Sequence, residues 1–445
     1  MKEQKLMTEG SIWRTILFFS IPLILGNLLQ QMYNTVDSII VGNYVGSNAL
    51  AAVGSSTALI NLLIAFSQGA AVGAGVVVSQ YLGAGRRHGV QASVHTALAM
   101  ALILGIILTG AGVAFSPAIL EWMKTPDEVM AASVSYLRLY SCGLVFNVVY
   151  NMAAGILNAA GNSKRSLMYL GTASVTNIFL DLLLIRGFGM GVEGAAIATD
   201  CSQALSSILA ILFLLRVDAD YRVSLRSIGI EPHMAVKIIR IGLPTGIQNM
   251  VISLSNVLVQ SGVNGFGAKA MAGFGAYMKV DGFNILPVMS FSMAVTTFTG
   301  QNYGAGKTDR VMKGMRVTIA MGMIYTIATG VLLLTFSDPI MRLFTSDSQV
   351  IGFGELAMKY FCPFYFLLSI MHGIAGTIRG AGKSVPPMII LLFSMCLFRI
   401  VWIQWILPYF DSIRGIFILY PVSWGLGVAL MILYAWKGKW MRYGK

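Results

Sequence analysis

Four aspartates lie within or next to long apolar stretches of this chain. Asp181, Asp200 and Asp281 lie inside such stretches, and Asp37 follows directly after the first one. A charge in a membrane-like environment costs several kcal/mol unless it is paired or faces water, so each carboxylate is a candidate for chemistry. Carboxylate oxygens suit two tasks in such a place, which are binding a small cation such as sodium and sharing a proton.

Side-chain amides and hydroxyls accompany these acids at helical spacing. Asn27, Gln30 and Asn34 precede Asp37 by steps of three and four residues, which places them on one helix face. The same kind of spacing relates polar residues of later segments: Asn147 and Asn151, Asn177 and Asp181, Thr199 and Gln203. The stripes indicate a polar cavity with a cation or proton site, although interhelical hydrogen bonds without a binding role also explain the amides.

The elements that position these residues are membrane-spanning helices. The 445 residues are 56% hydrophobic and 11% charged, against about 25% charged residues in a soluble domain. A spanning helix needs about 20 apolar residues. Twelve apolar segments fill the chain and leave no separate soluble domain, so we predict an all-α integral membrane protein with twelve transmembrane helices. The segments are 15–36, 49–80, 90–116, 129–157, 166–186, 190–216, 235–263, 270–300, 311–336, 350–377, 386–408 and 415–436.

The net charge of +13 follows from membrane topology. With the N-terminus in the cytoplasm, most of the 31 Lys and Arg residues fall in cytoplasmic loops, tails and helix ends. This bias predicts a multi-pass protein of the cell membrane with both termini in the cytoplasm, and it makes a nucleic-acid partner unnecessary. The sequence shows no paired-histidine motif, nucleophile elbow or metal-ligand spacing, so we expect neither an enzyme nor a bound cofactor.

The two halves of the chain are repeats of each other. Residues 79–86 (SQYLGAGR) recur as 300–307 (GQNYGAGK), and residues 155–163 recur as 376–384, both at an offset of 221. Both halves contain six segments and begin on the same side of the membrane, so they form parallel repeats, an arrangement typical of transporters. We predict two six-helix bundles, 1–220 and 221–445.

The duplication serves as an internal control for the acids. At the repeat offset Asp181 corresponds to Trp402, Asp200 to Pro421, and Asp37 to Leu258 or Val259. The second half is expected to adopt the same fold without these carboxylates. The fold alone therefore does not require them, which favours a functional role.

The chain resembles the multidrug and toxic compound extrusion (MATE) family. The likeness rests on two repeats of six segments, Pro22 in the first segment, Asp37 near its end, and Gly-Ala-Gly turns after the second and eighth segments. The turns at 160–162 and 381–383 fit as well. The resemblance implies a V-shaped antiporter of two bundles around a central cavity, which exports organic compounds against entry of sodium or protons.

The resemblance also implies roles for particular residues. Asp37, Asn177, Asp181 and Thr199 match the family's cation and proton site in the N-terminal bundle, where sodium would bind, and Asn151 joins them. Asp200 is a further candidate by its own position. Some family members carry an acid in the seventh segment, where this chain has only an amide stripe. The candidates for the substrate cavity are Asn27, Gln30, Asn34, Asn147, Asn249, Asn256 and His372.

The second half has charges that the first half lacks. Lys279, Asp281 and Arg399 correspond to apolar residues at the repeat offset. They suit either a structural salt bridge or a second proton relay, and we expect Asp281 and Arg399 to pair. His372 is equivalent to Asn151 and is either a hydrogen-bonded core histidine or a substrate or proton contact.

These observations predict a monomeric secondary antiporter in the lipid bilayer. It would export cationic or amphipathic small organic molecules in exchange for Na⁺ or H⁺, with no cofactor beyond the coupling ion. The alternative is a lipid-linked oligosaccharide flippase of the same two-bundle architecture. Such a flippase needs a basic cavity for its pyrophosphate, and the acids of the first half argue against an anionic substrate.

Overall fold

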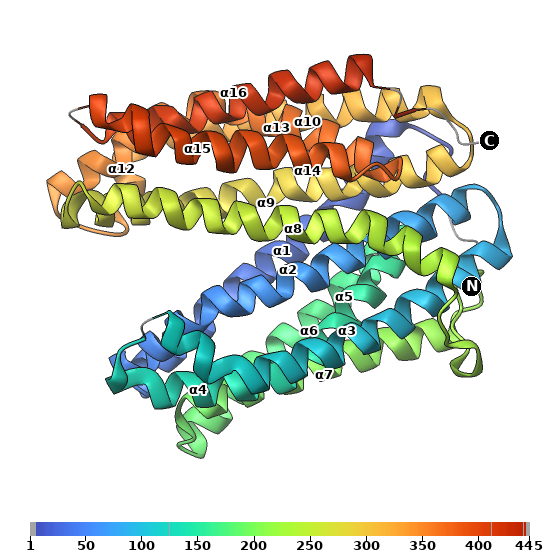
Figure 1. Ribbon diagram of the computed structural model, residues 1–445, viewed down its shortest axis with the longest axis horizontal. Coiled ribbons are helices and arrows are strands. Elements are labelled where there is room, and N and C mark those ends of the chain that lie inside the picture. The colour runs from blue at the N-terminus through green and yellow to red at the C-terminus, as the bar shows by residue number, and fades with distance from the viewer. Residues whose placement is uncertain (1–5, 124, 411, 439, 442–445) are drawn as a thin grey trace. The chain divides into compact units, whose positions relative to one another are not determined.

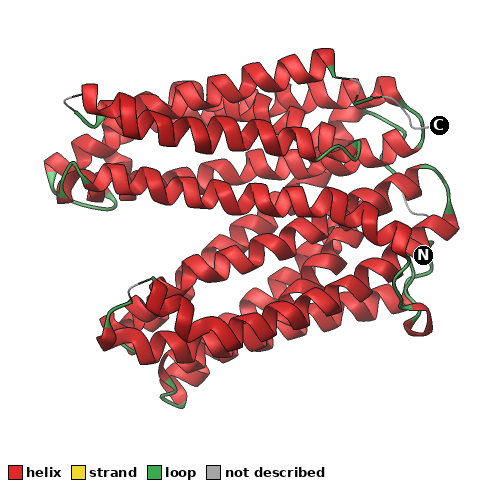
Figure 2. Ribbon diagram, in the orientation of Figure 1, coloured by secondary structure: helices red, strands yellow, loops and turns green. Residues whose placement is uncertain are grey.

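The computed structural model describes residues 6–123, 125–410, 412–438 and 440–441, and this part of the chain contains helices and no strand (Figure 2). The helices of the first half are α1 (Ile12–Tyr44), α2 (Ser47–Gly83), α3 (Arg87–Trp122), α4 (Asp127–Cys142), α5 (Leu144–Ala159), α6 (Ser163–Asp181) and α7 (Gly191–Arg216). Those of the second half are α8 (Pro232–Asn264), α9 (Ala268–Gly304), α10 (Thr308–Thr335), α11 (Ser337–Arg342), α12 (Ser348–Phe361), α13 (Tyr365–Gly380), α14 (Val385–Leu392), α15 (Phe398–Val401) and α16 (Arg414–Lys437) (Figure 1).

These helices form the twelve predicted spans. Among the described residues, nine helical stretches are long and apolar enough to cross a membrane, and α4 with α5, which meet at a 45° bend, forms a tenth. The remaining two are α8 and α9, of 33 and 37 residues, which carry more polar side chains, including Lys279 and Asp281 in α9. The prediction of an all-α membrane protein with twelve spans is confirmed.

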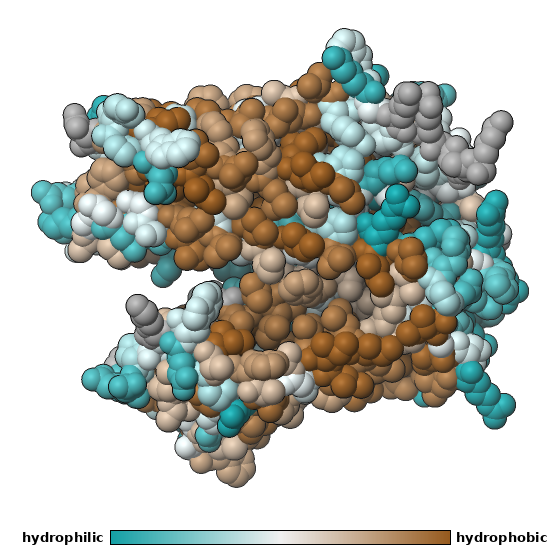
Figure 3. Space-filling model, in the orientation of Figure 1, coloured by the Kyte–Doolittle hydropathy of each residue, from teal (hydrophilic) through white to brown (hydrophobic). Residues whose placement is uncertain are grey.

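Apolar side chains cover the middle of the helices in each bundle, and hydrophilic ones gather at the helix ends (Figure 3). Examples on α3 are Ile106 and Ile107, which are 65% and 58% exposed. Exposed side chains of this kind would be costly in water, whereas lipid tails solvate them. The exposed surface is therefore built for a bilayer.

The first helix is longer than its apolar segment. We predicted a segment ending at residue 36 with Asp37 beyond it, but α1 continues to Tyr44 and places Asp37 inside the helix. Backbone hydrogen bonds propagate a helix through polar residues, whereas hydropathy detects only its apolar part. Asp37 is therefore fixed by helical geometry and does not lie in a loop.

Four glycines at equivalent positions end helices in both halves. Gly85 and Gly306 follow α2 and α9 with φ of 65° and 72°, and Gly161 and Gly382 follow α5 and α13 with φ of 81° and 84°. A left-handed residue after a helix satisfies its last carbonyls, and glycine adopts this conformation without steric cost. The repeated sequence motifs thus terminate equivalent helices in the two halves.

The described chain divides into two compact units. Of the described residues, unit 1 contains Leu6 and those within Ile21–Gly246, and unit 2 contains Met7–Ser20 and those from Ile247 onward. The sequence repeat divides the chain near residue 220, whereas the units exchange the first part of α1 and of α8. Each of these helices has a proline near its change of unit, Pro22 in α1 and Pro244 in α8.

Close helix packing also follows the repeat. A Cβ atom at Gly155 of α5 would lie 2.7 Å from the carbonyl oxygen of Ala71 in α2, and one at Gly376 of α13 would lie 2.6 Å from that of Ser292 in α9. Both pairs obey the 221-residue offset. Only glycine allows this approach between helix backbones, which is the usual role of small residues in membrane bundles.

Candidate acid site in unit 1

Asp37 of α1 and Asp181 of α6 meet in the interior of unit 1. Their carboxyl groups lie within hydrogen-bonding distance of each other. Asp181 is fully buried and Asp37 is partly buried. Two carboxylates are both acceptors only, so a hydrogen bond between them needs a proton on one of the two. Two negative charges in this place otherwise repel each other unless a cation lies between them.

Asn177 and Thr199 complete this group. Asn177 lies one turn before Asp181 on α6, and its amide nitrogen donates to Thr199 Oγ1 on α7 at 3.4 Å. Both side chains are buried. The structure therefore brings together Asp37, Asn177, Asp181 and Thr199 from the set that the resemblance implied, whereas Asn151 bonds to Ser67 and Asn147. Their role in coupling stays a prediction.

Four oxygen atoms of Asp37, Asp181 and Asn177 lack donors among the described residues. In the described part of the chain no N–H or O–H group donates to Asp37 Oδ1, to either carboxylate oxygen of Asp181, or to Asn177 Oδ1, and all of these atoms are buried. A buried oxygen without a partner costs about 1–3 kcal/mol, and more if it is charged. Oxygen ligands without protein donors are what a hard monovalent cation or a proton requires.

The helix that carries Asp181 continues into a π-helical turn, and the equivalent helix of the second half does the same. A π-helical turn, Leu182–Gly187, follows Asp181, and a second one, Trp402–Ile406, occupies the equivalent place in the second half. Trp402 stands at the position of Asp181. The turn therefore belongs to the shared fold, and the carboxylate is specific to the first half, as the duplication argument required.

Tyrosines near the acids were missed by the sequence analysis. The phenol of Tyr136 on α4 lies within electrostatic reach of Asp37, Asp181 and Asp200, and that of Tyr33 on α1 within reach of Asp37 and Asp181. A tyrosine in an apolar segment looks like ordinary core packing. The one available signal was the position of Tyr33 one turn before Asp37.

Asp200 takes a different place. Its carboxylate accepts a hydrogen bond from the backbone N–H of Gly143, at the bend between α4 and α5. It occupies the space where a Cβ atom of Gly143 would lie. Asp200 thus fixes the bend, which is a structural contact separate from the Asp37–Asp181 pair.

The amides of α5 form an interhelical network. Asn147 donates to Gln203 Oε1 on α7 at 2.9 Å, and Asn151 donates to Ser67 Oγ on α2 at 3.0 Å and to Asn147 Oδ1 at 2.8 Å. These are the interhelical hydrogen bonds that the sequence also allowed as an explanation for the amides. It ties α2, α5 and α7 together, and α7 carries Thr199 and Asp200.

The remaining cavity candidates differ in how far they are buried. On α1, Gln30 lies within hydrogen-bonding reach of Tyr33, Asn27 is partly buried and Asn34 is exposed. In unit 2, Asn249 is partly buried and His372 is buried. No measurement on the structure assigns a substrate to these residues, so their cavity role stays a prediction.

The predicted pair of Asp281 and Arg399 is not formed among the described residues. Asp281 accepts hydrogen bonds from Tyr365 at 2.6 Å and from Tyr277 at 3.3 Å. The Arg399 guanidinium donates to Asn256 Oδ1 and to Ser423 Oγ, and lies 4.4 Å from the centre of the Tyr420 ring. Phenols replace the cation at Asp281, and an aromatic face replaces the acid at Arg399. Lys279 is exposed.

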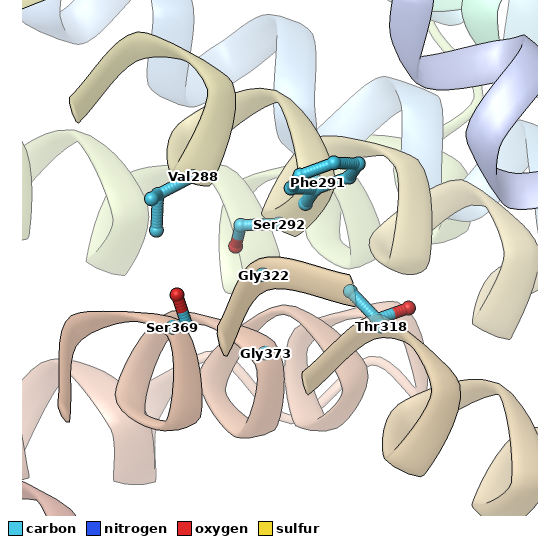
Figure 4. Close-up of a pocket in the computed structure, with 7 residues that line it drawn as sticks. All are labelled: Val288, Phe291, Ser292, Thr318, Gly322, Ser369 and Gly373. Atoms are coloured by element: carbon cyan, nitrogen blue, oxygen red, sulfur yellow. The ribbon is translucent and has the colours of Figure 1, made fainter. Parts of the chain in front are cut away.

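A gap among α9, α10 and α13 offers no ligand site. It is lined by residues that include Ser292, Thr318 and Ser369 (Figure 4). It has no room for a water molecule. The hydroxyl of Ser292 is used to donate to the carbonyl oxygen of His372 at 2.9 Å. The polar side chains here serve helix packing.

Long apolar helices in two parallel repeats, with a buried acid pair in one of them, define a multi-pass membrane transport protein. The chain belongs to the MatE family, whose sequence model matches residues 22–183 and 244–404. It is therefore a transporter and not an enzyme.

Named relatives and a solved structure cover nearly the whole chain. It is 28% identical over 443 residues to the probable multidrug resistance protein YpnP of Bacillus subtilis, covering 98% of this chain and 96% of that protein. It is 29% identical over 447 residues to the probable multidrug resistance protein YoeA of the same organism, covering 97% and 96%. A structure described as the outward-facing conformation of a multidrug resistance MATE family transporter has a TM-score of 0.91 at 24% identity, covering 100% of this chain and 99% of that one, which shows a shared fold.

Proposed function

We propose that this transporter is a multidrug efflux antiporter that exports cationic or amphipathic organic compounds in exchange for Na⁺ or H⁺. The observation that carries the proposal is the Asp37–Asp181 pair, with Asn177 beside it and buried oxygen atoms that have no donor. The names of its Bacillus subtilis relatives support drug export as the direction and purpose of transport.

Coupling follows from charge neutralisation at the pair. With the coupling ion absent, the acid pair carries negative charge and attracts an organic cation. A proton shared by Asp37 and Asp181, or a sodium ion held by their oxygens and by Asn177 and Thr199, cancels one of the two negative charges. The two ligands then stabilise different states of the protein, which is the thermodynamic requirement for exchange. We place the basic helix ends and both termini in the cytoplasm, with the protein acting as a monomer in the cell membrane.

The same pair disfavours the flippase alternative. A pyrophosphate headgroup needs cationic partners such as Arg and Lys. Buried carboxylates without donors would repel it.

The test is dye efflux from proteoliposomes in which a sodium gradient and a pH gradient are imposed separately. We expect one gradient to drive export of a fluorescent lipophilic cation, and Asp37→Asn and Asp181→Asn each to abolish the gradient-driven part. Asp309→Asn, which neutralises an exposed acid at the start of α10, is the matched control and should transport as the wild type does. Wild-type rates in either variant of the pair would contradict coupling there, and efflux that ignores both gradients would contradict antiport.

A further inference from the structure

Asp281, Tyr277 and Tyr365 form a closed triangle of oxygen atoms in unit 2. The hydroxyl groups of Tyr365 and Tyr277 lie 2.6 Å and 3.3 Å from Asp281 Oδ1. The two hydroxyl groups are also in hydrogen-bond contact with each other. The triangle joins α9, which carries Asp281 and Tyr277, to α13, which carries Tyr365. Each pair of oxygen atoms in it is therefore close enough to share a proton.

The triangle has three contacts but only two protons while Asp281 is ionised, because each phenol has one proton and the carboxylate has none. Tyr365 donates to Asp281, and the single proton of Tyr277 then serves either Asp281 or Tyr365. The contact that is not served brings two oxygen atoms together without a proton between them. A third proton, on the carboxyl group, lets each oxygen donate to the next around the ring. The triangle thus accommodates one further proton.

The side chains around Asp281 supply no positive charge to compensate a carboxylate. The titratable groups within electrostatic reach of it are Tyr277 of α9, Tyr365 of α13, Tyr420 of α16 and Cys362 in the turn between α12 and α13. All four are ordinarily neutral. Further ionisable groups on the packed helices are exposed or bonded elsewhere, and they include Lys279, Tyr325, Glu355, Lys359 and Arg399.

Asp281 also forms no ion pair among the described residues. It is partly exposed, whereas Tyr277 and Tyr365 are each 1% exposed. The carboxyl group is therefore the member of the triangle that can exchange a proton with its surroundings. An acid in a membrane bundle without a cationic partner is characteristic of proton transfer sites.

The first half of the chain has neither a carboxyl group nor a phenol at the equivalent positions. At the offset of 221, Asp281, Tyr277 and Tyr365 correspond to Ile60, Ser56 and Leu144. These three side chains are buried. The first bundle packs without the triangle, so the shared fold does not require it, and this favours a role beyond packing.

We propose that the triangle of Asp281, Tyr277 and Tyr365 is a proton-binding site of unit 2, separate from the acid pair of unit 1. Uptake forms one O–H bond on the carboxyl group of Asp281 and breaks none, and the phenol protons turn to close the ring between α9 and α13. Sodium does not suit this place, because phenol donors already point at Asp281 Oδ1. The inference does not rest on the coupling proposed for the acid pair.

Infrared difference spectroscopy of the full-length purified protein, between alkaline and acidic pH, tests the site. A carboxyl group acquires its own C=O stretching band when it is protonated. We expect a band in the wild type that Asp281→Asn removes, together with the uptake of one proton fewer per chain. Asp309→Asn, which neutralises the exposed acid at the start of α10, is the control and should keep this band. Wild-type spectra and proton uptake in Asp281→Asn would overturn the proposal.

Tyrosine variants test the ring. Tyr365→Phe and Tyr277→Phe each remove a hydroxyl group from the triangle, so each should move the pH midpoint of the band by about one unit or more. Tyr360→Phe removes a hydroxyl group from the same aromatic cluster and outside the triangle, and should leave the midpoint unchanged. Replacing sodium with choline should leave it unchanged as well. An unmoved midpoint in both variants of the triangle would show that Asp281 titrates without the ring, and a midpoint that follows sodium would show a cation site. Either result would refute the proposal.

Discussion

Tyr365 donates a 2.6 Å hydrogen bond to Asp281, so a phenol and not a cation holds this partly buried acid of unit 2. Tyr277 adds a second, longer bond from its place one turn away on α9. The two hydroxyl groups also lie in hydrogen-bond contact with each other, so the single proton of Tyr277 serves either Asp281 or Tyr365. Neutral donors thus satisfy Asp281, and Arg399 instead donates to Asn256 and lies against the Tyr420 ring.

Tyr365→Phe should destabilise the protein by about 1–3 kcal/mol, because it removes the shorter donor from the partly buried Asp281. The measurement is the thermal melting of the purified protein in detergent. Tyr360, whose ring packs against Phe417 of the same aromatic cluster and which is not a donor to Asp281, provides the control Tyr360→Phe. A variant that melts with the wild type would show that the Tyr365 bond is dispensable.

Exchanging the charges of Asp281 and Arg399 should not restore the protein. In Asp281→Arg with Arg399→Asp, the arginine would meet two phenols and the aspartate would face the Tyr420 ring, which repels an anion. We expect the double variant to reach membrane levels no higher than the worse single variant. Recovery to wild-type levels in a membrane-fraction immunoblot would mean that residues 281 and 399 interact directly, and it would contradict the separate partners described here.

The contact of Asp200 with Gly143 predicts a non-additive pair of substitutions. Gly143 has φ of −85°, which any residue adopts. We therefore expect Gly143→Ala to destabilise the protein because its methyl group overlaps the Asp200 carboxylate. Asp200→Ala removes the two nearest atoms, which belong to the carboxyl group, and leaves its Cβ atom 2.8 Å away, so the double variant should melt higher than Gly143→Ala alone. Simple addition of the two single losses would show that Asp200 does not fill this space.

Binding of an organic cation should depend on the coupling ion at equilibrium. A proton or sodium ion at Asp37 and Asp181 competes with the positive charge of the substrate, so raising the pH should strengthen binding if protons couple. Replacing sodium with choline should strengthen it if sodium couples. The measurement is a fluorescence titration of a lipophilic cation with purified protein, and Asp37→Asn should flatten the dependence. Binding that ignores pH and sodium alike would remove the pair from the coupling mechanism.

We expect Arg310 to stabilise unit 2. Its guanidinium donates to the backbone carbonyls of Gly10, Glu9 and Met7, at 2.9, 2.8 and 3.3 Å. Arg310→Ala leaves these carbonyls without a charged donor and should lower stability by about 1.5–3 kcal/mol. Arg316→Ala, on the exposed side of α10, is the control. Equal melting temperatures for the two variants would show that the contact with residues 7–10 contributes nothing.

The fold could be predicted because its determinants are periodic. Apolar segments of about twenty residues and a constant repeat offset can be recognised in a sequence even when no side-chain contact is known. The meeting of Asn177, Asp181 and Thr199 was also predictable, since helical spacing and the family likeness both pointed to it. The partners of Asp281 and Arg399 were not, because spacing along a chain says nothing about which neighbouring helix supplies a phenol or an aromatic face. Asp200 shows the same limit, since its partner is a backbone N–H group.

The exchanged half of α1 has a consequence for how the protein is made. Met7 is bound by the side chain of Gln301, which lies 294 positions later in the chain. Residues 7–20 belong to unit 2, yet they leave the ribosome before any of unit 1 from Ile21 onward. Domains generally assemble in the order of synthesis. Here the first part of α1 is made long before its partners in unit 2, so the nascent chain must keep residues 7–20 available until the second half has been synthesised.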